Sequence, residues 1–152
     1  MQDTHKIAVS LPEDGHKDDV YQMNYKVQIF DTDCYGVMWH GAYTKWLEMS
    51  RVGYLEALGP SLKTLSEQHD IIFPVYEQNF RYIQSARLDD KLQFRTSLKI
   101  ERPKWVFTQN VFRVLPDGCE EQVLACTSVI VLINGQGKVY RHIPEVLQKA
   151  LD

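Results

Sequence analysis

The sequence has 152 residues, of which 44% are hydrophobic and 24% charged, and these values are typical of one globular domain with a substantial core. Its formal net charge of −3 provides no basic field for a nucleic acid, and no apolar run approaches the length of a membrane-spanning helix. Cys34, Cys119 and Cys126 cannot all pair and lack the spacing of metal ligands. This argues for reduced thiols and against a disulfide scaffold or a zinc site.

The chain begins with a polar segment. Residues 1–19 are charged and contain Pro12 and Gly15, so we expect a flexible N-terminal arm followed by a single domain at residues 20–152. The arm lacks the apolar core of a signal peptide, and the default location of the protein is therefore the cytoplasm. At residues 21–29 apolar and polar side chains alternate, which predicts a half-buried strand.

An amphipathic helix is the strongest local signal. Large side chains recur on one face at intervals of three and four, and most charged side chains occupy the other faces. The predicted buried face carries Tyr43, Trp46, Leu47, Ser50, Tyr54 and Leu58, and the other faces carry Lys45, Glu48, Arg51 and Glu56. Gly59 and Pro60 end the helix. Because tryptophan and tyrosine bury large areas, we expect this helix at the centre of the domain, packed on a sheet.

The second half of the chain is rich in strands. After a helical turn or two at residues 61–69, turn signals separate four extended segments, near residues 71–83, 91–101, 105–115 and 119–133. Their short connections favour antiparallel neighbours. The apolar run at residues 129–133 is typical of a strand buried on both faces, and residues 144–151 predict a short C-terminal helix. Together these elements indicate an α+β protein, with about five antiparallel strands and one long helix across the sheet.

We expect the chemistry of this protein in residues 31–40, the loop before the long helix. His40, Gly41 and Ala42 fall at the helix start, where free backbone N–H groups and the helix dipole favour an anion or oxyanion. Asp33 lies seven residues before His40, and the intervening loop is long enough to aim its carboxylate at the same point. A base or nucleophile facing polarised N–H donors is what acyl transfer requires.

These residues carry a resemblance to a known family. The pattern D-T-D-x-x-G-V-x-W-H-x-x-Y, followed by W-L-E-x-x-R and ending in L-G, resembles the hot-dog-fold acyl-CoA thioesterases of the 4-hydroxybenzoyl-CoA thioesterase and YbgC-type branch. The matching positions are Asp31, Thr32, Asp33, Gly36, Val37, Trp39, His40, Tyr43, Glu48 and Arg51. The resemblance implies a sheet wrapped on one long central helix. It also implies subunits joined edge to edge, active sites at the dimer interface, and often a homotetramer.

The resemblance also implies roles for single residues. Asp33 matches the catalytic carboxylate, either as a nucleophile that forms a mixed anhydride or as a general base on water. His40 either orients the substrate or water, or acts through its backbone N–H, and Asp31 is a structural residue of the loop. Substrate-binding positions are Gly36, Trp39, Gly41 and Tyr43, although both aromatic residues also suit a core or an interface. The substrate is an acyl-CoA, and we expect no separate cofactor and no metal.

Basic residues offer candidate contacts for CoA. Lys99, Arg102, Lys104 and Trp105 span a predicted turn between two strands, with Arg113 further along. Basic side chains suit the CoA phosphates, and arginine or tryptophan can stack on adenine. A solvated turn accounts for the same residues equally well. Lys138, Arg141 and His142 form a reserve cluster.

Other chemistries remain open for the loop. Asp33 is also a typical turn-capping aspartate. Cys34, next to Asp33, invites a Cys–His hydrolase with His40 as the base, but nothing nearby besides His40 would activate the thiol. Asp31 and Asp33 together suggest a magnesium site of the phosphatase kind, but the remaining acids of such a site are missing nearby.

Two further functions fit the same fold. One is an acyl-thioester hydratase or dehydratase, although the Asp/His spacing of those enzymes is missing. The other is a non-catalytic module that binds acyl carrier protein or a membrane-envelope partner. The sequence leaves open which acyl group is used, and whether the carrier is CoA or acyl carrier protein.

Overall fold

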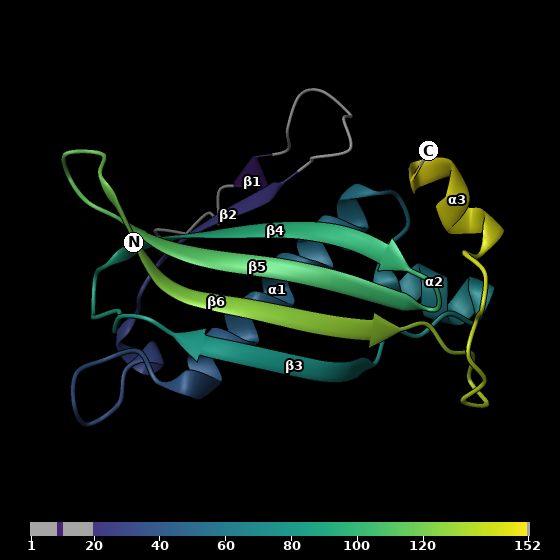
Figure 1. Cartoon of the computed structure of the whole chain (residues 1–152), viewed down its shortest axis with the longest axis horizontal. Helices are drawn as coiled ribbons and strands as arrows, with labels where there is room; N and C mark the ends of the chain where they lie inside the picture. Colours follow the sequence, from purple (N-terminus) through teal and green to yellow (C-terminus); the bar gives the residue numbers. More distant parts are fainter. Residues whose placement is uncertain (1–8, 11–19, 152) are drawn as a thin grey trace, which may run out of the picture.

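The computed structural model describes residues 9–10 and 20–151, which form one antiparallel sheet with a long helix across one face (Figure 1). The strand order is β1-β2-β4-β5-β6-β3, and all neighbours are antiparallel. The strands are β1 (Val9–Ser10), β2 (Tyr21–Lys26), β3 (Val75–Tyr82), β4 (Lys91–Glu101), β5 (Lys104–Val114) and β6 (Glu120–Val131). The predicted α+β fold is confirmed, with the two-residue β1 as an addition.

Three α-helices accompany the sheet in the described residues. The long helix is α1 (His40–Ala57), and two shorter helices, α2 (Leu62–His69) and α3 (Glu145–Leu151), lie near one end of the sheet (Figure 1). The Ser61 hydroxyl accepts the Thr64 N–H at 3.1 Å and caps α2, because a serine oxygen satisfies a donor that the first turn leaves free. All three helices agree with the sequence prediction.

The apolar core fills the space between α1 and the sheet. One cluster includes Trp46 and Leu47 of α1. A second includes Trp105 of β5, Leu65 of α2 and Leu147 of α3, so both short helices pack on the end of the sheet. Burying one large apolar side chain stabilises a fold by roughly 2 kcal/mol. The aromatic face predicted for the long helix therefore does hold the domain together.

The first strand ends earlier than its alternating pattern predicted. After β2 the chain enters a 3-10 turn, η1 (Ile29–Asp31), which leaves the side chains of Ile29 and Phe30 75% and 64% exposed. The predicted inward position of Ile29 is wrong because the backbone turns before that residue. β3 likewise covers only the second part of the segment predicted at residues 71–83.

The apolar run at residues 129–133 is not buried on both faces, and this prediction was wrong. β6 lies second from the sheet edge, between β5 and β3. Ile130 and Leu132 are buried, whereas Val129 and Val131 are half-buried. The alternation means that only one face of β6 packs on the core of this chain.

Arg51 belongs to α1, and its side chain is buried between the helix and the sheet. The sequence pattern had placed it on a face of the helix other than the buried one. Its Nη1 donates to Gln109 Oε1 at 3.1 Å and to Ser128 Oγ at 3.3 Å. Gln109 Nε2 donates in turn to the Leu47 carbonyl and to Thr96 Oγ1, both at 3.0 Å. Burial lowers the pKa of Arg51, because a charged group loses hydration there. Neutral acceptors thus hold a guanidinium that an apolar core would exclude.

The predicted N-terminal arm lies mostly outside the described residues. Val9 and Ser10 pair with Met23 and Gln22 of β2 and form the outer strand on that side of the sheet. The division into an arm and a single domain at residues 20–152 stays a prediction.

We expect Gln109→Met to destabilise the fold by about 2–4 kcal/mol, because it leaves the buried Arg51 guanidinium with one acceptor fewer. Urea unfolding measures this loss. The matched control is Gln122→Met, since the Gln122 side chain is half-buried and donates, within the described part of the chain, to Asn110 and Leu124 but not to the Arg51 network. An equal loss in both variants would contradict the importance of the Arg51 network.

Candidate active site

The site loop, residues 31–40, is fixed at its start by a buried carboxylate. Asp31 is 1% exposed, and its Oδ2 accepts the Tyr25 hydroxyl at 2.5 Å and the Gln28 N–H at 2.8 Å. Its Oδ1 accepts the Trp46 Nε1–H at 2.8 Å. Burial, together with the Asp31 carboxylate, raises the pKa of Tyr25 far above its usual value. One side chain therefore ties together β2, η1 and α1.

Asp33 stands two positions further on, in an exposed turn. Its Oδ1 accepts the N–H groups of Tyr35 at 2.8 Å and Val37 at 3.4 Å, an aspartate turn that orders the loop. Gly36 adopts φ +76° with open space where a Cβ would stand, so the turn conformation is what requires glycine there. Asp33 Oδ2 has no partner among the described residues. Half of the carboxylate is anchored, and the other half is available for chemistry.

Helix α1 begins with free backbone donors. The Trp39 N–H donates to the Asp31 carbonyl, and the Trp39 carbonyl accepts the Ala42 N–H, both at 3.0 Å. The N–H groups of His40 and Gly41 have no acceptor among residues 9–10 and 20–151. Two amide dipoles and the positive end of the helix therefore favour an anion at this point.

The indole of Trp39 lies over Gly41. A Cβ at Gly41 would stand 2.1 Å from carbons of the Trp39 ring, so this contact requires a residue without a side chain. The same indole is 44% exposed and meets the His40 imidazole edge-on, with the ring centroids 5.5 Å apart. Three of the predicted site residues thus form one surface at the helix start.

The loop packs against residues 84–90, which the sequence identified only as a turn. The Ala86 carbonyl accepts the Met38 N–H at 2.7 Å, and the Ala86 N–H donates to the Tyr43 hydroxyl at 3.3 Å. Tyr43 is 2% exposed and belongs to the core of this chain, and its predicted contact with substrate stays a prediction. Nothing in the local pattern around Ala86 signals this contact, because it joins positions more than forty residues apart.

The basic cluster expected to bind CoA does not meet Asp33 within one chain. It surrounds the turn between β4 and β5, whereas the site loop contacts residues just before β4. The eleven residues of β4 separate the two by roughly 35 Å. Trp105 is 3% exposed and packs edge-on against Phe73, so its ring faces the core. Lys104 lies 5.8 Å from the centre of the Tyr76 ring, and Lys99 pairs with the exposed Glu101.

The reserve cluster lines a hollow of about 490 Å³ between β6 and α3. The hollow is formed by Asn134 and residues 138–144, and it includes Lys138, Arg141 and His142. It follows the end of β6, whereas the site loop lies near the beginning of that strand. These basic residues also stand apart from Asp33 within one chain.

Other site types have little support in the described part of the chain. No group of three His, Cys, Asp or Glu side chains there could hold a metal ion. Cys34 and Cys119 are exposed free thiols, and burial raises the pKa of the Cys126 thiol. No helix at residues 9–10 or 20–151 combines the length and the apolarity needed to cross a bilayer.

Residues 27–151 match the thioesterase-like superfamily. This chain belongs to that superfamily. The match begins just after β2 and runs through α3, so it includes the site loop, α1 and the strands β3 to β6.

Individual members agree with this assignment. The chain is 30% identical over 97 residues to acyl-CoA thioesterase YbgC of Haemophilus influenzae, covering 63% of this chain and 71% of that protein. It is 27% identical over 124 residues to 4-hydroxybenzoyl-CoA thioesterase of Pseudomonas sp., covering 80% and 88%. A crystal structure of an aspartate-to-asparagine mutant of 4-hydroxybenzoyl-CoA thioesterase with 4-hydroxybenzoyl-CoA superposes with a TM-score of 0.79 at 21% identity, covering 88% and 99%. The predicted hot-dog fold is thereby confirmed.

The two aspartates of the loop should respond differently to the same substitution. We expect Asp31→Asn to destabilise the fold by about 3 kcal/mol, because an amide cannot accept three hydrogen bonds in the same places. Asp33→Asn should change the free energy of unfolding by less than about 1 kcal/mol, since an amide carbonyl can replace Oδ1. Thermal and urea unfolding of both variants provide the measurement. Equal losses would contradict the separation of an anchoring from an available carboxylate.

Proposed function

We propose that this protein is an acyl-CoA thioesterase that hydrolyses a thioester to a free acid and CoA, with Asp33 as its catalytic carboxylate. One observation carries the proposal. Asp33 Oδ2 and the N–H groups of His40 and Gly41, which have no partner among the described residues, all lie between the site loop and the first turn of α1. The thioesterase-like family and the thioester hydrolases among its relatives support the same reaction.

The residues suggest how the reaction proceeds. In the general-base form, Asp33 takes a proton from water while the water oxygen bonds to the thioester carbon. The carbonyl oxygen becomes an oxyanion, which the N–H groups of His40 and Gly41 stabilise. The carbon–sulfur bond then breaks, and the CoA sulfur receives the proton. In the nucleophilic form, Asp33 attacks the carbon itself, the CoA thiolate leaves, and water hydrolyses the mixed anhydride.

The exposed edge of the sheet supports a site shared between two copies of the chain. β3 is an outer strand of the described sheet, and an uncovered strand edge favours pairing with another chain. Large apolar side chains along it are exposed, including Tyr76 and Tyr82 at 67% and 53%. We infer a homodimer formed by β3, with a dimer of dimers as the larger assembly.

Such a dimer would resolve the separation of Asp33 from the basic cluster. Antiparallel pairing of two β3 strands reverses one sheet relative to the other. The turn between β4 and β5 of one copy then lies at the end of the sheet that holds Asp33 of the other copy. Arg102 and Lys104 would meet the CoA phosphates there, with Lys99, or the reserve cluster at Lys138, Arg141 and His142, as further contacts.

Free thiols at all three cysteines suit the reducing cytoplasm.

We expect Asp33→Asn to lower kcat by about 100-fold or more on a responsive acyl-CoA, because the amide can neither take a proton nor attack. Free-thiol release across short, long and aromatic acyl-CoAs measures it. Cys34→Ser is the matched control and should keep wild-type turnover. Normal turnover by Asp33→Asn would refute the carboxylate mechanism, and loss of activity in Cys34→Ser would favour a cysteine nucleophile.

A mixed oligomer tests the shared site. We expect the double variant Arg102→Ala/Lys104→Ala to raise KM for acyl-CoA about tenfold, and Asp33→Asn to be inactive. When the two chains are co-expressed, one site of each mixed dimer combines an intact Asp33 with an intact basic turn from the other copy. Activity at low substrate should then exceed that of either variant alone. No recovery in purified mixed dimers would place the basic turn outside the shared site.

A further inference from the structure

Arg113 at the end of β5 uses every donor of its guanidinium on its own chain. Nη1 donates to Asp90 Oδ2 at 2.9 Å and to the Ser85 carbonyl at 3.0 Å. Nη2 donates to Glu121 Oε2 at 2.7 Å and to Gln84 Oε1 at 3.0 Å, and Nε donates to Glu121 Oε2 at 3.1 Å. An arginine has five N–H donors, so none remains for a phosphate. The earlier suggestion that Arg113 contacts CoA is therefore replaced.

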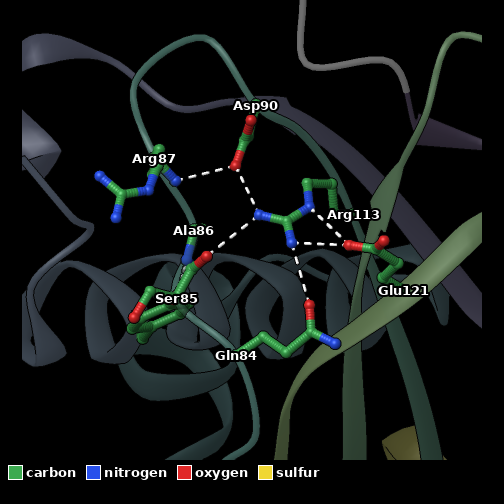
Figure 2. A network of polar contacts seen from close by, with 8 residues as sticks. Gln84, Ser85, Ala86, Arg87, Asp90, Arg113 and Glu121 are labelled. Carbon is green, nitrogen blue, oxygen red and sulfur yellow. Dashed lines mark hydrogen bonds and ion pairs between the residues drawn. The ribbon is translucent and has the colours of Figure 1, made fainter.

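Three of these contacts hold residues 84–90, the segment that follows β3 (Figure 2). Asp90 Oδ2 also accepts the Arg87 N–H at 2.8 Å, which closes the segment into a turn. Glu121 of β6 holds the other side of the guanidinium, so the turn is fastened to the rigid sheet. Two carboxylates face one arginine, and the hydrogen bonds that Arg113 donates to Glu121 and Asp90 raise its pKa.

The held segment is the surface on which the site loop rests. Inside it, Ala86 is fully buried and bonds through both backbone groups, to the Met38 N–H and to the Tyr43 hydroxyl. Val37 pairs with Arg87 in an isolated bridge. The Asp33 N–H donates to the Val37 carbonyl at 2.9 Å, and Met38 pairs with Thr32 in another isolated bridge. A shift of Ala86 therefore moves the backbone that presents the carboxylate.

We propose that Arg113 is a positioning residue for the reaction, which fixes residues 84–90 as the support that aligns Asp33 with the amides of His40 and Gly41. This rests on the function proposed above for that site. The planar shape of the Arg113 guanidinium matters as well as its charge, because a lysine ammonium cannot reach two carboxylates, an amide and a carbonyl together. A displacement of the reacting group by about 1 Å can cost up to about 100-fold in rate, although Arg113 never touches the substrate.

The experiment compares Arg113→Lys with two controls. Arg95→Met removes a similar guanidinium, which lies on β4, pairs with Glu120 and forms no hydrogen bond or ion pair with the described residues 84–90. Leu132→Val loosens the core cluster away from the site. We expect Arg113→Lys to lower kcat about tenfold with KM changed less than twofold, whereas both controls keep kcat within about twofold. Methylguanidine should restore part of the activity of Arg113→Ala and leave the activity of the controls unchanged.

Hydrogen exchange gives a readout that does not depend on the enzyme assay. In Arg113→Lys the amides of Met38 and of residues 84–90 should exchange faster, while those in the centre of α1 stay unchanged. The inference is overturned if exchange at Met38 is unaffected in Arg113→Lys. It is also overturned if kcat of Arg113→Lys falls no further than that of the control variant whose thermal stability is most similar. If the wild-type protein hydrolyses no acyl-CoA, the proposed function fails, and exchange alone then decides whether Arg113 positions the loop.

Discussion

The buried carboxylate of Asp31 is the constraint on which the rest of the site depends. A carboxylate in the core must have its oxygens satisfied, and Tyr25, Gln28 and Trp46 do so from three different elements. The Asp31 carbonyl also receives the Trp39 N–H, so the same residue sets where α1 begins. Strand, turn and helix therefore cannot shift independently, and the short loop between Asp31 and Trp39 has both ends fixed.

The loop is held on its other side by the turn at residues 84–90. Its contacts there are single backbone hydrogen bonds, each of which contributes only about 1 kcal/mol. Such contacts define a geometry only where the supporting surface is itself rigid. On the side of the core, the loop is fixed by the buried carboxylate of Asp31. On its other side, it rests on residues 84–90, which the ion-paired Arg113 holds at the end of the sheet. Between these two supports lies a turn whose carboxylate has one oxygen bound and one free, which restricts its orientation without using up its reactivity.

The sequence predicted those features that depend on local patterns. The spacing of Tyr43, Trp46 and Leu47 gave α1 and its buried face, and turn signals separated the strands of the second half. The pattern around Asp33 predicted the family, which the match to the thioesterase-like superfamily confirms, and it predicted the site loop, which stays a prediction. The errors arose where tertiary contacts prevail over local pattern. Ile29 turns outward because η1 interrupts the strand. The periodicity of a helix likewise cannot predict that a charged side chain such as Arg51 is buried, because its neutral acceptors lie on two strands distant in the sequence. Contacts between Arg113 and residues 84–90 are equally invisible, since they join positions more than twenty residues apart.

The stacking of Trp39 on Gly41 has a consequence for how this site can vary among related chains. The space that a side chain at position 41 would need is occupied by the indole, so the two positions are sterically coupled. A chain with alanine at position 41 must carry a smaller residue at position 39 or turn its ring away from the helix. In either case the first amides of α1 lose the indole that lies over Gly41, and water gains access to the side of the site where we propose that the oxyanion forms. Among related chains, substitutions at positions 39 and 41 should therefore occur together.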